Sequence, residues 1–543
     1  MLREQMVGSV RPTLLALGGS VSLILLIACV NIANMLLARG AARQREMAIR
    51  LALGAGRSRL LRQVLTESAL LALAGGALGV LLAWLGTRAL VMFNAGSIPR
   101  LEEARVDGVV LGFSLAASAL TGMLIGLVPA LQQSQTALRA ALGEGTRSSR
   151  GGPARRARNA LIVGQVAMGF VVLIAAGLLG RSLLALQRVP PGFDPRDVMA
   201  MQVSPPRATY DSAYKVIAFL ERVQSELRTI PGAEVSAVYP LPASGESWSG
   251  SFVIEGNGAR QGETLLHAEY GVAAPGYFRT MRIPLLEGRD FSTDDRRGSP
   301  GVVIVDEVLA RQNWPGRSAI GKRLNTRGPN GEWDEIVGVV RHVRNAGPRE
   351  DGEGQIYYPV LQRPQRPMAL VVRAAAPAGS VGPAMRAALR RVDPNLPASK
   401  LDRMERLVSG TFARDRFNTI IIAVFALAAL VLPSVGLYGV MASAVAQRTR
   451  EIAIRSALGG RPSALRWMVM REGVLVALAG IGVGGLASLA TAGALRSLLY
   501  DIAPTDAPTY AGIALLLLMV VLFAAHGPAR RATRVDPMIV LRE

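Results

Sequence analysis

The chain has 543 residues, half of them hydrophobic, and its mean hydropathy is +0.31. A soluble protein of this length would normally form several domains of lower hydropathy, so these values argue against a soluble protein. The formal net charge of +22 could suggest a nucleic-acid-binding protein, but the basic runs contain no interleaved aromatic residues and no groove-reading motif.

Apolar segments of roughly 20 residues, each long enough to cross a bilayer, recur along the chain. Seven are present: Leu14–Leu37, Ala69–Val91, Val109–Leu131, Ala160–Leu186, Thr419–Ala446, Val474–Leu498 and Tyr510–Ala525. The sequence therefore predicts a multi-pass membrane protein of about seven spans.

The positive charge is concentrated beside these spans. The loops near residues 38–68, 132–159, 447–472 and 528–543 hold 23 Arg and 7 acidic residues. Because basic loops stay on the cytoplasmic side, these four loops are expected inside, next to anionic headgroups. The N-terminal tail and residues 187–413 are then outside, and the C-terminus is inside.

One decamer occurs twice. Arg45–Gly54 reads REMAIRLALG, and Arg450–Gly459 reads REIAIRSALG. The similarity continues without a gap, so that Arg45–Gly75 aligns with Arg450–Gly480. Such a repeat indicates a duplicated module with an insertion between its copies.

Each copy predicts a short amphipathic helix on the inner face, joined by a tight elbow to a spanning helix. A glutamate and an arginine four residues later lie on one helical face in the favourable order. A following glycine can end the helix in the left-handed conformation. We interpret the repeat as a docking and coupling element carried by Glu46, Arg50, Gly54, Glu451, Arg455 and Gly459.

The outer segment predicts a mixed α/β domain. A strand at Asp197–Val203, a helix at Asp211–Ile230 capped by Asp211 or Ser212, and a strand at Val235–Val238 follow one another. The order recurs at Ala369–Val372 and in a helix near Val381–Val392 opened by Ser380. Strand-like runs lie between them at Ser251–Ile254, Val302–Val305 and Ile336–Val340. We expect two split βαβ-like halves around a strand-rich insert.

No pattern typical of catalysis or metal binding appears. His267, His342 and His526 are scattered, and Cys29 is the single cysteine, so neither a metal site nor an internal disulfide is predicted. Gly316–Arg323 reads GRSAIGKR and nearly matches a phosphate loop, but Arg323 replaces the Ser or Thr that would hold magnesium. We interpret it as a turn between short strands.

Two further sets of polar residues have structural interpretations. The acidic pairs Asp294-Asp295 and Asp306-Glu307 are interpreted as solvated loop or helix-end charges rather than catalytic carboxylates. Asn31, Asn34 and Gln165 are the polar exceptions in the spans, and we expect them to form interhelical hydrogen bonds.

The two repeat regions resemble the coupling region of FtsX-like permeases of the MacB type, and LLIACVNIANMLLARGAARQREMAIRLALGA is similar to their duplicated branch. The outer segment resembles the MacB periplasmic core domain. The residues that carry this second likeness are VAAPGYFRTMRIPLLEGRDF at Val272–Phe291, VVIVDEVLARQNWPGRSAIGKRL at Val302–Leu324 and EIVGVVRHVR at Glu335–Arg344.

The resemblance implies an α-helical multi-pass membrane protein with one α+β extracytoplasmic domain, located in the bacterial plasma membrane. Its regions would be a first FtsX-like region at 1–150, a connecting span at 151–186, a MacB-like core domain at 187–413 and a second FtsX-like region at 414–543. The family's duplicated form has eight spans and two outer domains. We therefore expect that an upstream span and outer domain are missing from this chain.

The resemblance also implies partners. No Walker sequence is present, so a separate cytoplasmic ATPase would supply the energy and would contact the six repeat residues. A periplasmic or outer-envelope partner and a homo- or pseudo-dimer of permease units are further expectations; no cofactor is expected. The functions left open are an ABC transporter permease that exports or releases a substrate, a mechanical signalling subunit acting on a partner such as a cell-wall hydrolase, and an enzyme on a membrane scaffold.

Overall fold

The computed structural model describes residues 15–32, 34, 66, 70, 73–88, 107–109, 111–113, 116, 152–256, 266–327, 331–345, 347, 349, 352–376, 378–447, 454–455, 458 and 461–532. These residues belong to two compact units. The membrane unit comprises Met1–Ala185 and Asp415–Glu543, and the outer unit comprises Leu186–Arg414.

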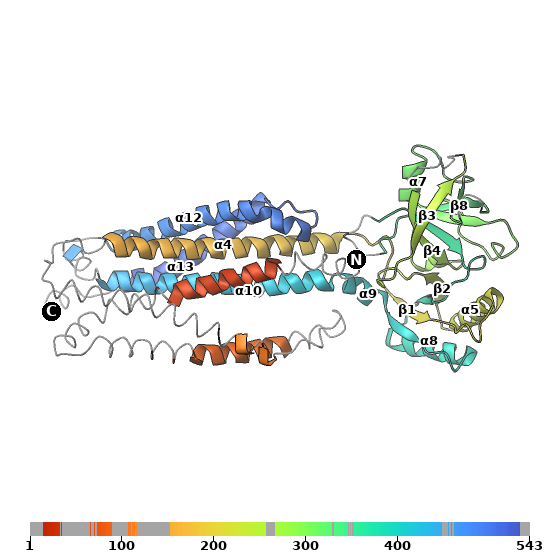
Figure 1. Cartoon of the computed structure of the whole chain (residues 1–543), viewed down its shortest axis with the longest axis horizontal. Helices are drawn as coiled ribbons and strands as arrows, with labels where there is room; N and C mark the ends of the chain where they lie inside the picture. The colour runs from red at the N-terminus through yellow and green to blue at the C-terminus, as the bar shows by residue number, and fades with distance from the viewer. Residues whose placement is uncertain are drawn as a thin grey trace. The chain divides into compact units, whose positions relative to one another are not determined.

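Long apolar helices build the membrane unit (Figure 1). They are the first helix, which contains Leu15–Ile32, and α4 (Gly152–Arg188), α10 (Ala413–Gln447), α12 (Pro462–Leu495), followed by the 3₁₀ turn η2 (Arg496–Leu498), and α13 (Ala507–Ala532). All five helices are long and apolar enough to cross a membrane, and they correspond to the predicted spans one, four, five, six and seven. A shorter apolar helix, Leu73–Arg88, falls within the predicted second span. Most of the predicted third span lies outside the described residues.

The surfaces of the two units differ in the way that a membrane protein requires. Large apolar side chains are exposed along the membrane helices, including Leu427, Leu486 and Phe523. In the described part of the outer unit, exposed large apolar side chains are limited to Tyr214, Leu266, Leu285 and Leu286. Contiguous exposed apolar surface is unfavourable in water but favourable against lipid, which identifies the helical unit as the one embedded in the bilayer.

Helix α4 packs closely against its neighbours through glycines. A Cβ atom added at Gly169 of α4 would lie 2.9 Å from the carbonyl oxygen of Ala429 in α10. Cβ atoms added at Gly480 and Gly484 of α12 would lie within 3 Å of α4 atoms, at Val166 and Ala167 respectively. Small residues allow such close helix contact, which stabilises membrane helix bundles by van der Waals packing.

The described part of the outer unit contains one sheet of eleven strands. The strands are β1 (Val198–Val203), β2 (Glu234–Tyr239), β3 (Ser249–Ile254), β4 (Leu266–Ala273), β5 (Leu285–Gly288), β6 (Val302–Asp306), β7 (Arg323–Asn325), β8 (Asp334–Val340), β9 (Gln355–Pro359), β10 (Met368–Arg373) and β11 (Ser399–Arg403).

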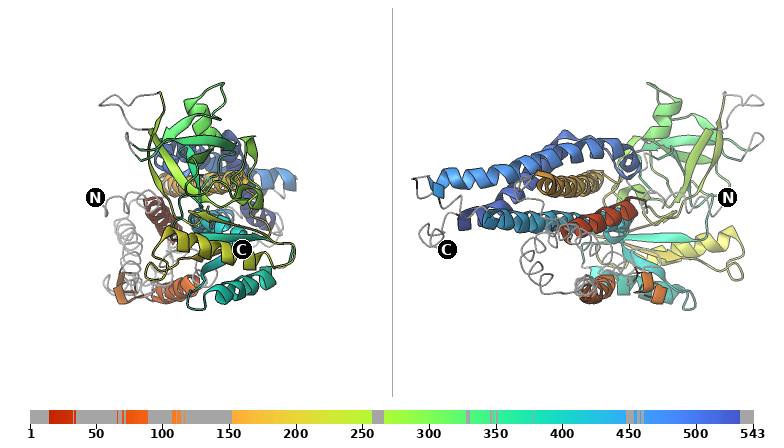
Figure 2. Two further views of the ribbon diagram at one scale, coloured as in Figure 1. Left: turned by 90° about the vertical axis from the view of Figure 1, so that its right-hand side faces the viewer. Right: turned by 60° about the vertical axis from the view of Figure 1, so that its left-hand side comes forward.

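Four of these strands form a wing with the antiparallel order β11-β1-β10-β2. Helices α5 (Ala213–Leu227) and α8 (Ala378–Val392) lie side by side against it (Figures 1 and 2). Along the chain the order is β1-α5-β2 and then β10-α8-β11, which confirms the two predicted split βαβ-like halves. Ser212 caps α5 by accepting a hydrogen bond from the Lys215 N–H. Of the two predicted caps, Asp211 and Ser212, the structure therefore confirms Ser212. The prediction that Ser380 opens the second helix is wrong, because α8 begins two residues earlier.

The other strands close into a barrel. The pairings β4–β3, β3–β7, β7–β8, β8–β6, β6–β9 and β9–β4 return to their starting strand, and β5 adds to β8. Strand β4 also pairs with β2, so it joins the barrel to the wing. Closure leaves few free strand edges, which protects a water-exposed sheet from pairing with other chains.

Two cores stabilise the outer unit. Met199, Met201 and Val203 of β1 contribute to the core shared with α5 and α8, whereas Val198 and Ala200 contribute to the core on the opposite face. This alternation follows from the two-residue period of a strand. The second core also receives α6 (Tyr277–Thr280) and Met404, the first residue of α9 (Met404–Thr411). The short helix α7 (Glu307–Asn313) follows β6.

Candidate functional site

The predicted coupling residues are mostly not described by the structure. Glu46, Arg50, Gly54, Glu451 and Gly459 lie outside the described residues. Arg455 is described: it is helical and exposed, and its Nη1 atom lies 3.3 Å from the sulfur of Met468 in α12. The repeat motif therefore contacts the next membrane helix at this point, and the coupling role of all six residues stays a prediction.

A first link joins α4 to the outer unit at residues 189–197. It is fastened to the outer unit along its length. Arg344 donates its N–H to the carbonyl oxygen of Pro191 at 3.1 Å, and Asp194 donates its N–H to that of Met281 at 3.0 Å. Gly192 has a φ of +88°, and a Cβ atom there would lie 2.1 Å from the carbonyl oxygen of His342, so only glycine fits.

The guanidinium group of Arg373, at the end of β10, anchors the same link. It donates to the carbonyl oxygens of Thr280 at 2.7 Å, Arg196 at 2.5 Å and Asp194 at 2.7 Å. Burial lowers the pKa of Arg373. The Asp194 carboxylate accepts hydrogen bonds from Arg196, which hold the pKa of this carboxyl below its usual value. Charged and backbone groups thus fix the link against β10 and α6.

A second link, helix α9, joins the outer unit to α10. One residue, Phe412, separates Thr411 at the end of α9 from Ala413 at the start of α10. Met404 is fully buried in the second core, and Leu407 and Val408 pack against that core. Both links are therefore packed or hydrogen-bonded to the outer unit within a few residues of a long membrane helix.

A proline in α10 creates an unusual contact with α4 and the first helix. Pro433 lacks an N–H group, which removes the usual intrahelical donor to the carbonyl of Ala429. This carbonyl faces Gly169 of α4. One turn further on, Asn31 of the first helix donates from Nδ2 to the carbonyl oxygen of Leu432 at 3.1 Å. The three helices meet where α10 lacks one of its backbone hydrogen bonds.

The structure confirms the predicted interhelical hydrogen bond of Asn31. For Asn34 and Gln165, each 1% exposed, the described residues supply no hydrogen-bond partner to the side-chain amides, so the expected bonds are not seen there. Gly436 lies beside this group, since a Cβ atom added to it would lie 2.4 Å from Asn31 Oδ1 and 3.4 Å from Gln165 Nε2.

One residue of each acidic pair, Asp295 and Asp306, is buried and has a structural role, whereas Asp294 is exposed as predicted. Asp306 is fully buried, caps α7 by accepting from the Leu309 N–H at 2.9 Å, and contacts His342 Nδ1 at 2.5 Å through its other oxygen. Asp295 is 5% exposed and pairs with both terminal nitrogens of Arg289. The helix-end interpretation is confirmed for Asp306. The expectation of solvated charges is wrong for Asp306, which contacts His342, and for Asp295, which pairs with Arg289 six residues earlier.

The near-match to a phosphate loop is a turn, as predicted. Gly316 and Gly321 have positive φ angles, and Arg323 begins the short strand β7 rather than a helix. Phosphate loops use the N-terminus of a helix, which is absent from this segment. Among the described residues, no group of three or more His, Cys, Asp or Glu side chains could hold a metal ion.

Sequence patterns of known families match these same regions. The FtsX-like permease C-terminal family model matches residues 19–138 and again residues 423–537. The MacB-like periplasmic core domain model matches residues 160–392, between the two permease copies. The chain is an FtsX-like permease with a MacB-like periplasmic core domain. The resemblance inferred from the sequence motifs is thereby confirmed for both kinds of region.

Relatives of this FtsX-like permease are ABC transporter proteins. It is 27% identical over 281 residues to the probable export ATP-binding/permease protein MacB of Pseudomonas entomophila, a match of 49% of this chain and 40% of the relative. It is 25% identical over 281 residues to the uncharacterized ABC transporter permease YknZ of Bacillus subtilis, a match of 49% of this chain and 68% of the relative. The chain thus spans about two fifths of the length of the MacB relative.

Among solved structures, the FtsX-like permease is similar to the periplasmic region of MacB from Actinobacillus actinomycetemcomitans. The identity is 16%, the TM-score is 0.26, and the match covers 40% of this chain and 92% of that one.

Proposed function

We propose that this FtsX-like permease is the membrane subunit of an ABC transporter in the bacterial plasma membrane and transmits movement from a cytoplasmic ATPase to its outer unit. The observation that carries the proposal is the pair of short links held against the outer unit. Each joins a long membrane helix to the core of the outer unit through buried side chains or backbone hydrogen bonds.

Helix lengths support transmission over the whole thickness of a membrane. At 1.5 Å per residue, the 37 residues of α4 and the 35 residues of α10 give rods of roughly 50–55 Å. The hydrocarbon core of a bilayer is about 30 Å thick, so each rod extends beyond it. A tilt imposed at the inner end of such a rod displaces the other end.

The composition of the described membrane helices favours a mechanical role over a polar substrate pathway. Their buried polar side chains are neutral: Ser20, Asn31, Asn34, Gln165, Ser182, Asn418, Ser488 and Thr509. Ionisable residues on a substrate or proton pathway are typically buried among the helices. The proposed substrate is therefore handled at the outer face, in keeping with the export function named for the MacB relative.

The proposed ATPase lies outside these 543 residues. No Walker sequence occurs here, whereas the name of the MacB relative combines an ATP-binding part with a permease. The inner-face helices that carry Glu46 and Glu451 are the proposed docking elements. Their short amphipathic pattern suits a groove on a partner, because an i, i+3, i+4 face can be buried there.

Reversal of two charges tests this docking. We expect the double variant Glu46→Arg, Glu451→Arg to insert into the membrane normally but to lose co-purification with the Walker-type ATPase encoded next to it. Glu221→Arg, an exposed substitution on α5, is the matched control and should retain the ATPase. Undiminished recovery of the ATPase with the double variant would refute the docking assignment.

A deletion experiment separates export from mechanical signalling. Loss of the gene should cause a transported drug, peptide or lipoprotein to accumulate in the cell or membrane if the subunit exports. Altered cell-wall turnover without accumulation of any such substrate would favour the signalling alternative.

A further inference from the structure

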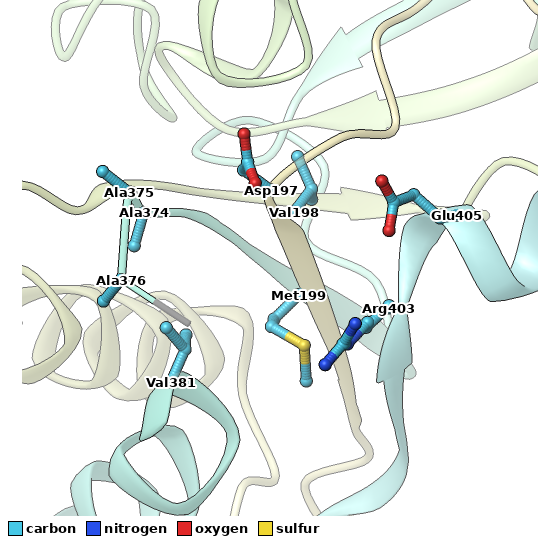
Figure 3. Close-up of a pocket in the computed structure, with 9 residues that line it drawn as sticks. All are labelled: Asp197, Val198, Met199, Ala374, Ala375, Ala376, Val381, Arg403 and Glu405. Carbon is cyan, nitrogen blue, oxygen red and sulfur yellow. The ribbon is translucent and has the colours of Figure 1, made fainter. Parts of the chain in front are cut away.

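A cavity of about 320 Å³ lies in the outer unit where its two links enter. This volume falls at the lower end of the range of small-molecule sites. The lining residues come from β1, the segment after β10, α8 and the start of α9: Asp197, Val198, Met199, Ala374, Ala375, Ala376, Val381, Arg403 and Glu405. Figure 3 shows Arg403 and Glu405 on one side of the cavity, the three alanines and Val381 on the other, and Met199 between them.

The inner wall is apolar. Met199, Ala374 and Val381 are each less than 9% exposed and belong to the core shared with α5 and α8. A Cβ atom added at Gly382 of α8 would lie 3.4 Å from the Cε atom of Met199, so the Met199 side chain packs close to α8. Such a wall favours a ligand with a short hydrocarbon part.

The rim carries both signs of charge. Asp197, Arg403 and Glu405 are exposed, and within the part of the chain that the structure describes their side chains form no ion pair and no hydrogen bond. The guanidinium of Arg196, a further nearby cation, is hydrogen-bonded to the Asp194 carboxylate. The two carboxylates and the guanidinium at the cavity therefore form no ion pair with one another and can each pair with a charged group of a ligand.

The position of Asp197 is specifically maintained. Its φ is +59°, a left-handed conformation that a non-glycine residue adopts only at some cost. The carbonyl oxygen of Asp197 accepts the N–H of Ala374 at 3.1 Å, so the residue is held across the cavity wall. Local strain of this kind concentrates at binding sites because the surrounding fold must hold it in place.

We propose that this cavity binds a small zwitterion whose ammonium group and oxyanion are joined by a short hydrocarbon spacer. The oxyanion pairs with the fork of the Arg403 guanidinium, which suits phosphate and carboxylate oxygens. The ammonium group donates hydrogen bonds to Asp197 and Glu405. The spacer lies against Met199 and Val381.

The ethanolamine phosphate unit is our specific example of this chemistry. It could come from a phosphatidylethanolamine headgroup or from a soluble phosphodiester. Asp197 follows the end of α4 by nine residues, and Glu405 precedes α10 by eight, so both binding groups lie close in the chain to membrane spans. A ligand that joins β1 to α9 would tie the two links together.

Binding is measured with the full chain in phosphatidylglycerol nanodiscs, with glycerophosphoethanolamine as the soluble probe. We expect saturable binding by calorimetry, reduced at least tenfold by Arg403→Gln and by Glu405→Gln. Ala376→Phe, which fills the cavity without changing charge, should reduce it similarly. The matched controls Arg386→Gln and Glu221→Gln remove exposed charges elsewhere and should bind as the unaltered chain does.

Two further comparisons identify the ligand chemistry and its source. Glycerophosphocholine should bind at least tenfold more weakly, because its trimethylated nitrogen has no N–H to donate to the carboxylates. Competition by phosphatidylethanolamine added to the nanodiscs would assign the site to a lipid headgroup, and its absence would assign it to a soluble zwitterion. No saturable binding, or equal binding by the charge variants and their controls, would overturn the proposal.

Discussion

At the scale of single residues, glycines and a buried arginine decide how closely the helices and strands of this permease pack against their neighbours. Gly169 allows α4 to contact the carbonyl of Ala429, while Arg373 holds three backbone carbonyls around the first link. In both places a backbone oxygen is the partner. Backbone oxygens are present at every position, so a sequence pattern carries little information about which of them are contacted.

The Gly169 contact can be tested by adding one methyl group. Gly169→Ala would place a Cβ atom 2.9 Å from the Ala429 oxygen, an overpacking that should destabilise the helix bundle by about 1–3 kcal/mol. Gly164→Ala is the control in the same helix, since an added Cβ there meets no atom within 4 Å. Thermal unfolding in detergent should show a lower Tm for Gly169→Ala alone; equal Tm values would mean that α4 and α10 do not pack in this way.

The acid stability of the outer unit should depend on Asp194. Its pKa is lowered chiefly by the hydrogen bond from Arg196, so the folded state favours the ionised carboxylate. The stabilisation is present above the ordinary pKa of 3.8 and is lost as pH falls through the lower folded value. Asp194→Asn should reduce the fall in Tm between pH 5 and pH 3, recorded by circular dichroism. An unchanged pH profile would contradict the ion-paired arrangement.

At the scale of elements, the two links matter more than the strands they join. Helix α9 packs into the second core and passes to α10 through one residue. Helix α4 passes to β1 through a segment bonded to Met281 and Arg344. A flexible connection would let the membrane helices tilt without displacing the outer unit, so their fastening is what the proposed transmission needs.

Insertion of Gly-Gly-Gly between Phe412 and Ala413 should uncouple the second link. Glycine-rich segments behave as flexible coils and do not carry bending forces. We expect ATP-driven function to fall at least tenfold while membrane insertion stays normal. The same insertion after Gly256, in an exposed turn, is the control. Full activity of the Phe412 insertion would show that force does not pass through this link.

At the scale of the whole molecule, charge distribution and the repeat predict which parts lie on each side of the membrane. In a Cys29→Ser background, a single cysteine at Glu221 should react with a membrane-impermeant maleimide in intact spheroplasts. A single cysteine at Ser148, in an Arg-rich loop, should react only after permeabilisation. The reverse labelling pattern would invert the topology and remove the basis for ATPase docking.

Sequence by itself predicted the five long apolar helices that the structure describes, the repeated permease region and the two split βαβ-like halves. These depend on composition and on local periods of 2.0 and 3.6 residues, which a single chain displays directly. The helix at Asp211–Ile230 and the strand at Val302–Val305 were therefore predicted close to α5 and β6 as observed.

Tertiary structure alone decided the closure of the barrel, the burial of Asp306 against His342, and the anchoring of the first link by Arg373. It also brought Asp197 and Arg403 to one cavity although 205 intervening residues separate them. Each of these features joins residues from distant parts of the chain. Local periodicity reports which face of an element is apolar, but it does not report which other element will cover that face.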